Sequence, residues 1–231
     1  MGAPEAVIFD LDGVLIDSET VWNDARRELV EQSGGRWRDE AQRAMMGMSS
    51  LEWSRYMHEQ LAVPMSDEDI SEEVVSRLEG LYRKRLPLLP GAREAVRALA
   101  SRWPLAIASS ANRSIIALAL ELACLSDCFT ASVSSEEVAH GKPAPDVYLE
   151  AARRISHEPA GCAAVEDSAN GLRAAAAAGM SVIAIPNRAF PPGEQALSSA
   201  DVVLESIEGL SPAVVARLGT RGAENGQNTP S

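Results

Sequence analysis

Two aspartates, Asp10 and Asp12, stand two positions apart immediately after the short apolar segment of residues 6–9, and Gly13 follows them. If that segment is a β-strand, both carboxylates project from its end on the same side, because side chains alternate along a strand. A glycine at this position lets the chain turn sharply away and leaves the carboxylates open to approach. Such a pair can divide nucleophilic and proton-transfer roles, although the same spacing also occurs in helix caps and solvated loops.

Polar residues of complementary chemistry follow three later apolar segments. They are Ser109, Ser110 and Asn112 after residues 105–108, Lys142 within Gly-Lys-Pro-Ala-Pro-Asp, and Glu166 and Asp167 after residues 163–165. Hydroxyl and free backbone N–H groups ahead of a helix can seat an anion, and a lysine framed by glycine and proline is a fixed cation. Taken one at a time, each group is equally well explained as a helix cap or a surface charge.

Together, these groups favour chemistry on a phosphoryl group. Four carboxylates at one sheet edge repel each other unless a cation lies among them, and oxygen ligands without histidine or cysteine favour Mg²⁺ over Ca²⁺ or Zn²⁺. A metal, a lysine and N–H-rich turns provide the charge neutralisation and alignment that phosphoryl transfer requires. In that chemistry Asp10 can attack phosphorus and form an aspartyl-phosphate, while Asp12 protonates the leaving oxygen and then deprotonates water.

The segments that carry these residues alternate between strand and helix patterns. Nearly continuous apolar runs predict buried parallel strands at residues 6–9, 105–108, 129–133, 163–165, 182–185 and 202–204. Helical patterns lie between them, near residues 91–102, 112–123, 145–155 and 168–178. This alternation predicts an α/β fold with a doubly wound, Rossmann-like parallel sheet, in which the carboxyl ends of the strands form the ligand crevice.

A long interval without strands separates the first two strands and predicts an inserted, all-helical cap at residues 17–88. Apolar residues recur there at helical spacing: Trp22, Ala25 and Leu29; Ile70, Val74, Leu78 and Leu81; and, less regularly, Leu51, Tyr56 and Leu61. A crossover between two parallel strands needs only about a dozen residues. The remaining residues of this interval are therefore expected to form a separate helical unit that can close over a site. The core then comprises residues 1–16 and 89–218, and residues 219–231 are expected to be a disordered tail.

Composition limits the partners of the chain. With 231 residues and a net charge of −12, the sequence is a poor electrostatic match for nucleic acid or an anionic membrane surface. No secretory signal or membrane-spanning segment is visible, and the three cysteines have no metal-like spacing. We therefore expect a cytoplasmic protein, monomeric or weakly homo-oligomeric, with small buried cysteines and a small phosphorylated metabolite as its partner.

The complete set of motifs resembles the four-part signature of the haloacid dehalogenase-like hydrolases. It comprises Asp10-x-Asp12-Gly13-Val14, Ser109, Lys142 and Glu166-Asp167, in the correct order over almost the whole chain. The resemblance implies that Asp10 is the nucleophile and Asp12 the acid/base. It further implies that Mg²⁺ is bound by Asp10, the carbonyl of Asp12 and Asp167, with Glu166 adjacent. The phosphoryl group would be held by Ser109 and Lys142, helped by Gly13 and by Ser110 and Asn112 of the 109–112 turn.

Further features are similar to the branch that contains β-phosphoglucomutase and small sugar-phosphate or phosphoglycolate phosphatases. They are Asp17-Ser18-Glu19, the helical insertion and Lys142-Pro143-x-Pro145-Asp146. Mutases of this branch typically grip a second phosphate with a histidine on the first cap helix and an arginine in a glycine-rich cap turn. The corresponding positions here are Trp22 and Ser50, the latter next to Gly47 in the segment Met-Gly-Met-Ser-Ser. The resemblance therefore favours a phosphatase over a phosphosugar mutase, and Asp12 argues against dehalogenase chemistry.

Two alternatives stay open at this level. Trp22 and Trp53 either pack the interior of the cap or line the substrate pocket, where Gly47 and Ser50 would also contact the substrate. A non-enzymatic receiver module likewise places acids, a hydroxyl and a lysine around a phospho-aspartate. Receivers are much shorter, however, and carry the phosphoacceptor after an interior strand, which makes this the remote alternative.

Overall fold

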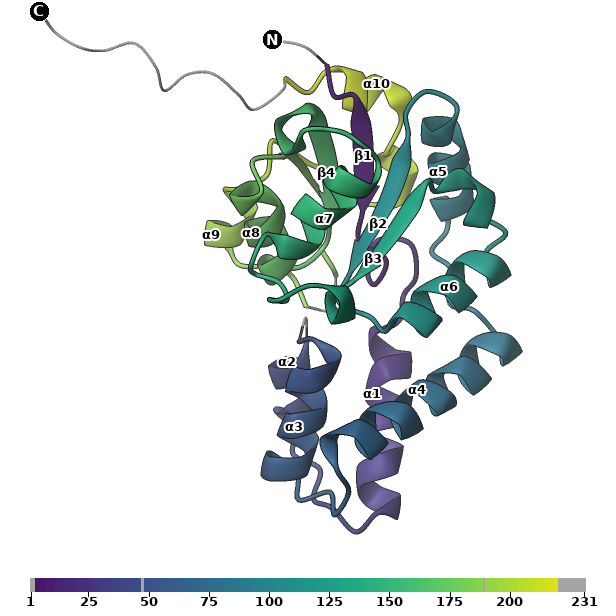
Figure 1. Cartoon of the computed structure of the whole chain (residues 1–231), viewed down its shortest axis with the longest axis vertical. Coiled ribbons are helices and arrows are strands. Elements are labelled where there is room, and N and C mark those ends of the chain that lie inside the picture. Colours follow the sequence, from purple (N-terminus) through teal and green to yellow (C-terminus); the bar gives the residue numbers. More distant parts are fainter. Residues whose placement is uncertain (1–2, 47, 189, 220–231) are drawn as a thin grey trace, which may run out of the picture.

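Six short strands form one parallel sheet, in the order β3-β2-β1-β4-β5-β6, in the computed structural model, which describes residues 3–46, 48–188 and 190–219 (Figure 1). They are β1 (Ala6–Phe9), β2 (Leu105–Ser109), β3 (Ala131–Ser134), β4 (Cys162–Glu166), β5 (Ser181–Ala184) and β6 (Val202–Val203). The predicted doubly wound α/β sheet is confirmed. The third strand begins at Ala131 rather than at residue 129, because Phe129 ends a short 3-10 turn and packs edge-on against Phe9.

Helices cover both faces of the sheet. On one face lie α5 (Ala92–Ala100), α6 (Arg113–Leu122) and α10 (Pro212–Ala216), and on the other lie α7 (Asp146–Arg154), α8 (Ala169–Ala177) and α9 (Glu194–Leu197). Strand side chains alternate between the two apolar cores, so that Val7 belongs to the first core and Ile8 to the second. Helices α5 to α8 each begin one residue later than predicted, because the expected first residue is the N-cap in every case.

The strand order reverses beside β1, which pairs with β2 on one side and with β4 on the other. Phe9 is in register with both Ile107 and Val165. The residues that follow these three positions therefore emerge at one level of the sheet edge. In doubly wound sheets, ligands bind at such a reversal, outside the carboxyl ends of the strands.

Five helices lie between β1 and β2 within the described ranges; α5 packs on the sheet, and Figure 1 shows the other four as a group at one end of the sheet. They are α1 (Glu19–Gln32), α2 (Ala41–Met45), α3 (Ser50–Gln60) and α4 (Asp67–Lys84). Helix α4 packs against α1 and α3 through the predicted apolar face, which Tyr82 extends. Leu51 was expected to belong to an apolar face, but it is 58% exposed because it lies on the side of α3 opposite the buried Trp53.

The two segments that join these helices to the sheet lie side by side. Ile16 and Leu88 form an antiparallel bridge. The N–H of Leu89 donates to the carbonyl of Leu15 at 2.9 Å, and the N–H of Asp17 donates to the carbonyl of Pro87 at 2.8 Å. The helical insertion therefore leaves and rejoins the sheet at one place, next to the aspartate pair.

Other expectations concern the cysteines, the tail and the membrane. Cys162 is buried and Cys128 is half-buried. Cys124 is exposed, so the expectation of a buried side chain is wrong for this cysteine. Cys124 has a left-handed backbone conformation just after the end of α6, where the chain turns at the surface. The predicted disordered tail falls largely on residues 220–231, which lie outside the described residues, and the carbonyl of Gly219 accepts a hydrogen bond from Ser181 Oγ at 2.7 Å. Among the helices of the described part, none is both long and apolar enough to cross a bilayer.

Candidate active site

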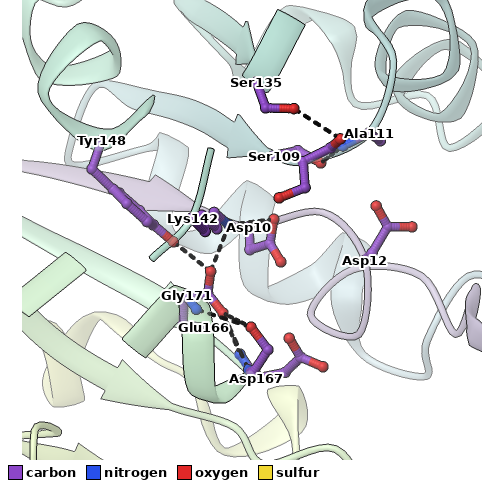
Figure 2. A network of polar contacts seen from close by, with 12 residues as sticks. Asp10, Asp12, Ser109, Ala111, Ser135, Lys142, Tyr148, Glu166, Asp167 and Gly171 are labelled. Carbon is purple, nitrogen blue, oxygen red and sulfur yellow. Dashed lines mark hydrogen bonds and ion pairs between the residues drawn. The ribbon is translucent and has the colours of Figure 1, made fainter. Parts of the chain in front are cut away.

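Lys142 joins two carboxylates that come from neighbouring strands. Its Nζ lies 2.9 Å from Oδ1 of Asp10 and 2.6 Å from Oε1 of Glu166, and all three side chains are buried (Figure 2). Burial alone would lower the pKa of Lys142, but Asp10 and Glu166 raise the pKa above its usual value. The lysine is therefore a fixed positive charge beside the predicted nucleophile and not a surface residue.

Glu166 accepts hydrogen bonds on both carboxylate oxygens. Besides Lys142, the hydroxyl of Tyr148 donates to Oε1 at 2.8 Å. The backbone N–H groups of Asp167 and Ser168 donate to Oε2 at 3.0 and 3.2 Å. Glu166 thus positions Lys142 and ties the end of β4 to the start of α8.

Two glycines make room for the acidic side chains. Gly13 has a positive φ of 77°, and a Cβ at this position would overlap the carboxylate of Asp167. Gly171, inside α8, has no room for a Cβ either, because Glu166 occupies that space. Gly13 was expected to keep the approach to the aspartates open and to help bind phosphate. What the structure shows at this position is that the Asp167 carboxylate lies where a Cβ would be.

Three buried carboxylates meet at this edge of the sheet. Oxygen atoms of Asp10, Glu166 and Asp167 lie within 4.8 Å of one another. Burial raises the pKa of Asp10 to about 8; Lys142 opposes this effect, and Glu166 adds to it. Burial, together with the charges of Glu166 and Asp10, also raises the pKa of Asp167 well above its ordinary value. One lysine does not neutralise three carboxylates, so this all-oxygen donor set fits a hard divalent cation.

Asp12 is held apart from that cluster. Its Oδ1 accepts hydrogen bonds from the hydroxyl of Ser18 and, at 3.1 Å, from Nε1 of Trp22, and Figure 2 shows its carboxylate separated from Asp10. Burial raises the pKa of Asp12, whereas the bonds from Ser18 and Trp22 lower it. Of the four acids predicted to bind metal, the structure brings three carboxylates together and directs the Asp12 carboxylate elsewhere. A carboxyl group near a reacting centre but outside the cation cluster is suited to proton transfer.

The polar residues at the end of β2 and just after it are divided between two places. Ser109 is buried, its Oγ accepts the N–H of Ala111 at 3.0 Å, and Figure 2 shows the hydroxyl directed toward Asp10. Ser110 lines the same cavity as Asp10. Asn112 does not line that cavity: it is the N-cap of α6, and its Nδ2 donates to Oε1 of Glu136 at 2.7 Å.

A cavity of about 490 Å³ lies between the strand ends and the inserted helices. Asp10, Asp12, Lys142 and Asp167 line it from the sheet side, and Glu19, Trp22, Arg26, Arg43 and Trp53 line it from the helices. The ring centroids of Trp22 and Trp53 are 6.0 Å apart, so these residues both pack against each other and border the cavity.

Ser50 lines a separate hollow with Glu136 and Gly141, and Gly47 lies outside the described residues.

Sequence reasoning missed four residues of this site: Tyr148, Gly171, Arg26 and Arg43. One signal was available for Arg26, which follows Trp22 by four positions and interrupts the apolar face formed with Ala25 and Leu29. A charged residue on a buried helix face usually has a specific partner. The contributions of Tyr148 and Gly171 depend on the position of Glu166, which only the packed structure reveals.

Comparisons with known proteins agree with this arrangement. A sequence model described as haloacid dehalogenase-like hydrolase matches residues 4–179. The chain is 33% identical over 212 residues to a probable pseudouridine-5′-phosphatase of Drosophila melanogaster, covering 89% of this chain and 90% of that protein. It is 34% identical over 186 residues to hexitol phosphatase B of Escherichia coli K12, covering 78% of this chain and 83% of that protein.

Another relative is much longer than this chain. The bifunctional riboflavin kinase/FMN phosphatase of Arabidopsis thaliana is 33% identical over 203 residues, which cover 87% of this chain but 53% of that protein. Among solved structures, CbbY from Rhodobacter sphaeroides in complex with phosphate has a TM-score of 0.82 at 26% identity, covering 93% of this chain and 100% of that one. The similarity therefore includes both the sheet and the inserted helices.

Proposed function

Because the chain belongs to the haloacid dehalogenase-like hydrolase family, we propose that it is a Mg²⁺-dependent phosphatase that hydrolyses a small phosphorylated metabolite through an aspartyl-phosphate on Asp10. One observation carries this proposal: Asp10 and Asp12 border one cavity in two different environments. Asp10 is paired with Lys142 and lies among carboxylates, whereas Asp12 is bound by uncharged donors. A nucleophile and a separate proton carrier are what two-step phosphoryl transfer requires.

The metal would be held by Asp10 and Asp167, with the carbonyl of Asp12 as a further ligand and Glu166 adjacent. When bound, Mg²⁺ would neutralise charge on the phosphoryl oxygens and on the nucleophile. Glu166 holds Lys142 in place through the 2.6 Å contact. Lys142 and the Ser109 hydroxyl then bind phosphoryl oxygens and keep phosphorus in line with Asp10.

The reaction proceeds in two displacements. In the first, a carboxylate oxygen of Asp10 attacks phosphorus, and the bond from phosphorus to the leaving oxygen breaks while protonated Asp12 gives that oxygen its proton. In the second, the Asp12 carboxylate takes a proton from water. The water oxygen bonds to phosphorus, and the bond from phosphorus to Asp10 breaks to release phosphate and restore both carboxyl groups.

Residues 17–88 act in this proposal as a cap over a core made of residues 1–16 and 89–218. The paired main-chain contacts at Ile16 with Leu88 and at Leu15 with Leu89 support one common hinge. Cap residues such as Trp22 face the reacting groups across the cavity, so they would choose the substrate. The name of the hexitol phosphatase relative supports a phosphorylated sugar or a compound of similar size.

Phosphate release from a panel of phosphorylated sugars and short phosphorylated acids tests the proposal. We expect hydrolysis with Mg²⁺, loss of hydrolysis with EDTA, and loss in Asp10→Asn. Asp127→Asn removes an exposed aspartate and serves as the matched control. Full activity of Asp10→Asn would exclude the covalent intermediate.

A phosphosugar mutase is the second candidate, because it would need cations on the cap side of the cavity to hold a second phosphate. Arg26 and Arg43 supply cations on the cap side of the cavity, although neither is at a position where mutases typically have a basic residue. Incubation with β-glucose 1-phosphate and a trace of the bisphosphate separates the candidates. Glucose 6-phosphate formed without net phosphate release would support the mutase.

A further inference from the structure

Arg26 is a buried cation that contacts aromatic rings. The residue is 7% exposed, and its ζ carbon lies 4.6 Å from the ring centroid of Trp22 and 4.9 Å from that of Trp53. Within the described residues, its Nε has no hydrogen-bond partner. The guanidinium is thus held in place by two indoles, and its Nε–H is left without an acceptor among the described residues.

A charge in this position is costly without a partner. Burial lowers the pKa of Arg26 to about 10, while Glu19 and Asp12 act to raise it, so the side chain stays protonated at neutral pH. Cation–π contacts offset part of the desolvation, but a buried guanidinium is normally also paired with an oxyanion. Arg26 lines the same cavity as Asp10, where a bound substrate would meet it.

We propose that Arg26 binds a carboxylate at the end of the substrate remote from phosphorus, so that the phosphatase acts on phosphorylated carboxylic acids. This inference rests on the proposed function and adds the substrate class. The indoles of Trp22 and Trp53 contact the guanidinium, and the N–H groups at its edge match the geometry of a planar carboxylate.

The charges around Arg26 favour a monoanion over a second phosphate. Glu19 and Asp12 line the same cavity and repel a dianion more strongly than a carboxylate. Arg43, an exposed cation at the same cavity, adds long-range attraction for an anionic substrate.

The subsite is also close to the reacting groups. The indole of Trp22 that lies against Arg26 also donates its N–H to Asp12 at 3.1 Å. One aromatic side chain therefore separates the carboxylate subsite from the proton-transfer residue. We expect a short substrate of a few carbons.

Two esters of equal carbon number test the inference: 3-phosphoglycerate carries a carboxylate where glycerol 3-phosphate carries a neutral hydroxymethyl group. The measured quantity is the ratio of their kcat/KM values. We expect a ratio of about tenfold or more in the wild type, as for one charge-assisted bond pair, and a ratio near one in Arg26→Met. Arg26→Lys should keep part of the preference, and it is the second variant should Arg26→Met fail to fold.

Arg27→Met is the matched control, because Arg27 is on the same helix, is exposed, and pairs with Glu31 at 2.8 Å. It should keep the wild-type ratio. Equal kcat/KM values for the two esters in the wild type, or an equal loss for both in Arg26→Met, would overturn the inference. The ratio of kcat/KM values for fructose 1,6-bisphosphate and fructose 6-phosphate measures the preference for a second phosphate. A ratio larger than that for 3-phosphoglycerate and glycerol 3-phosphate would overturn the carboxylate assignment.

Calorimetric binding to Asp10→Asn separates this inference from the proposed function. If the wild type hydrolyses no ester, the proposed function fails. Tighter binding of 3-phosphoglycerate than of glycerol 3-phosphate, abolished by adding Arg26→Met, would still support the carboxylate subsite. Equal binding of the two esters would overturn it.

Discussion

Nε1 of Trp22 donates a hydrogen bond to Oδ1 of Asp12 over 3.1 Å, and the hydroxyl of Ser18 donates to the same oxygen. Trp22 belongs to the first inserted helix, whereas Asp12 belongs to the turn that follows the central strand. A residue of the insertion therefore orients a carboxylate of the sheet edge. Hydrogen bonds to the ionised form favour that form, so the position of α1 also affects the proton affinity of Asp12.

Replacing Trp22 by phenylalanine should change the pH dependence of the reaction. Burial raises the pKa of Asp12 and the Trp22 bond lowers it, so Trp22→Phe should raise this pKa further. The limb of the kcat–pH profile that reports Asp12 then moves to higher pH, and kcat falls by about tenfold as the carboxyl group loses its orientation. Trp103→Phe is the control, since Trp103 Nε1 donates to the carbonyl of Pro4, away from the site. An unchanged profile in Trp22→Phe would show that the bond does not tune Asp12.

Removing the Lys142 charge should destabilise the protein as well as inactivate it. Lys142→Met leaves Asp10 and Glu166 buried without their cation, and breaking such a buried pair costs about 3–5 kcal/mol. The free energy of unfolding in urea, measured in EDTA, checks this expectation. Adding Glu166→Gln removes one of the stranded charges, so the double variant should recover part of the stability while phosphate release stays absent. A double variant less stable than Lys142→Met would contradict the charge argument.

The strands and helices were predictable because their patterns are local. Buried parallel strands form apolar runs, and the helical patterns predict the starts of α5 to α8 to within one residue. The clustering of Asp10, Glu166 and Lys142 was predictable for a related reason: in a parallel sheet the carboxyl ends of the strands share one edge.

What the sequence did not reveal depends on how the insertion packs on the sheet edge. Asn112 looked like part of an anion seat, but the neighbouring segment places Glu136 against it, and this contact has no sequence signal. Ser50 occupies the position expected to face the substrate, yet α3 directs it to another hollow. Arg26 was missed because its partners Trp22 and Trp53 come from two different helices.

Adding a methyl group at two helical glycines should have opposite effects. Gly171→Ala places a Cβ where the Glu166 carboxylate lies, so we expect a loss of about 1–3 kcal/mol and of phosphate release. Among the described residues, a Cβ at Gly80 on α4 would meet no atom within 4 Å, so Gly80→Ala should stabilise the protein by about 0.5–1 kcal/mol through helix propensity. Chemical denaturation of both variants provides the comparison. A stabilised Gly171→Ala would mean that Glu166 can move without cost.

Glu19 should make the protein less stable as the pH rises toward neutrality. Burial raises the pKa of Glu19 from 4.5 to about 7; Asp12 and Asp17 add to the effect and Arg26 opposes it. Between these two values the folded state binds more protons than the unfolded state, so the contribution of Glu19 to stability declines with rising pH and is lost above about 7.

Glu19→Gln removes this titration, so the difference between the two proteins reports Glu19 together with its coupling to Asp167, whose pKa the Glu19 charge helps to raise. We expect the Tm of Glu19→Gln minus that of the wild type to rise from pH 5 to pH 7 and then to level off, in EDTA throughout. A difference that is constant across this interval would mean that Glu19 is as well solvated in the folded state as in the unfolded chain. Glu19 would then be ionised throughout this interval, and its repulsion of a dianion at the Arg26 subsite would add to that of Asp12.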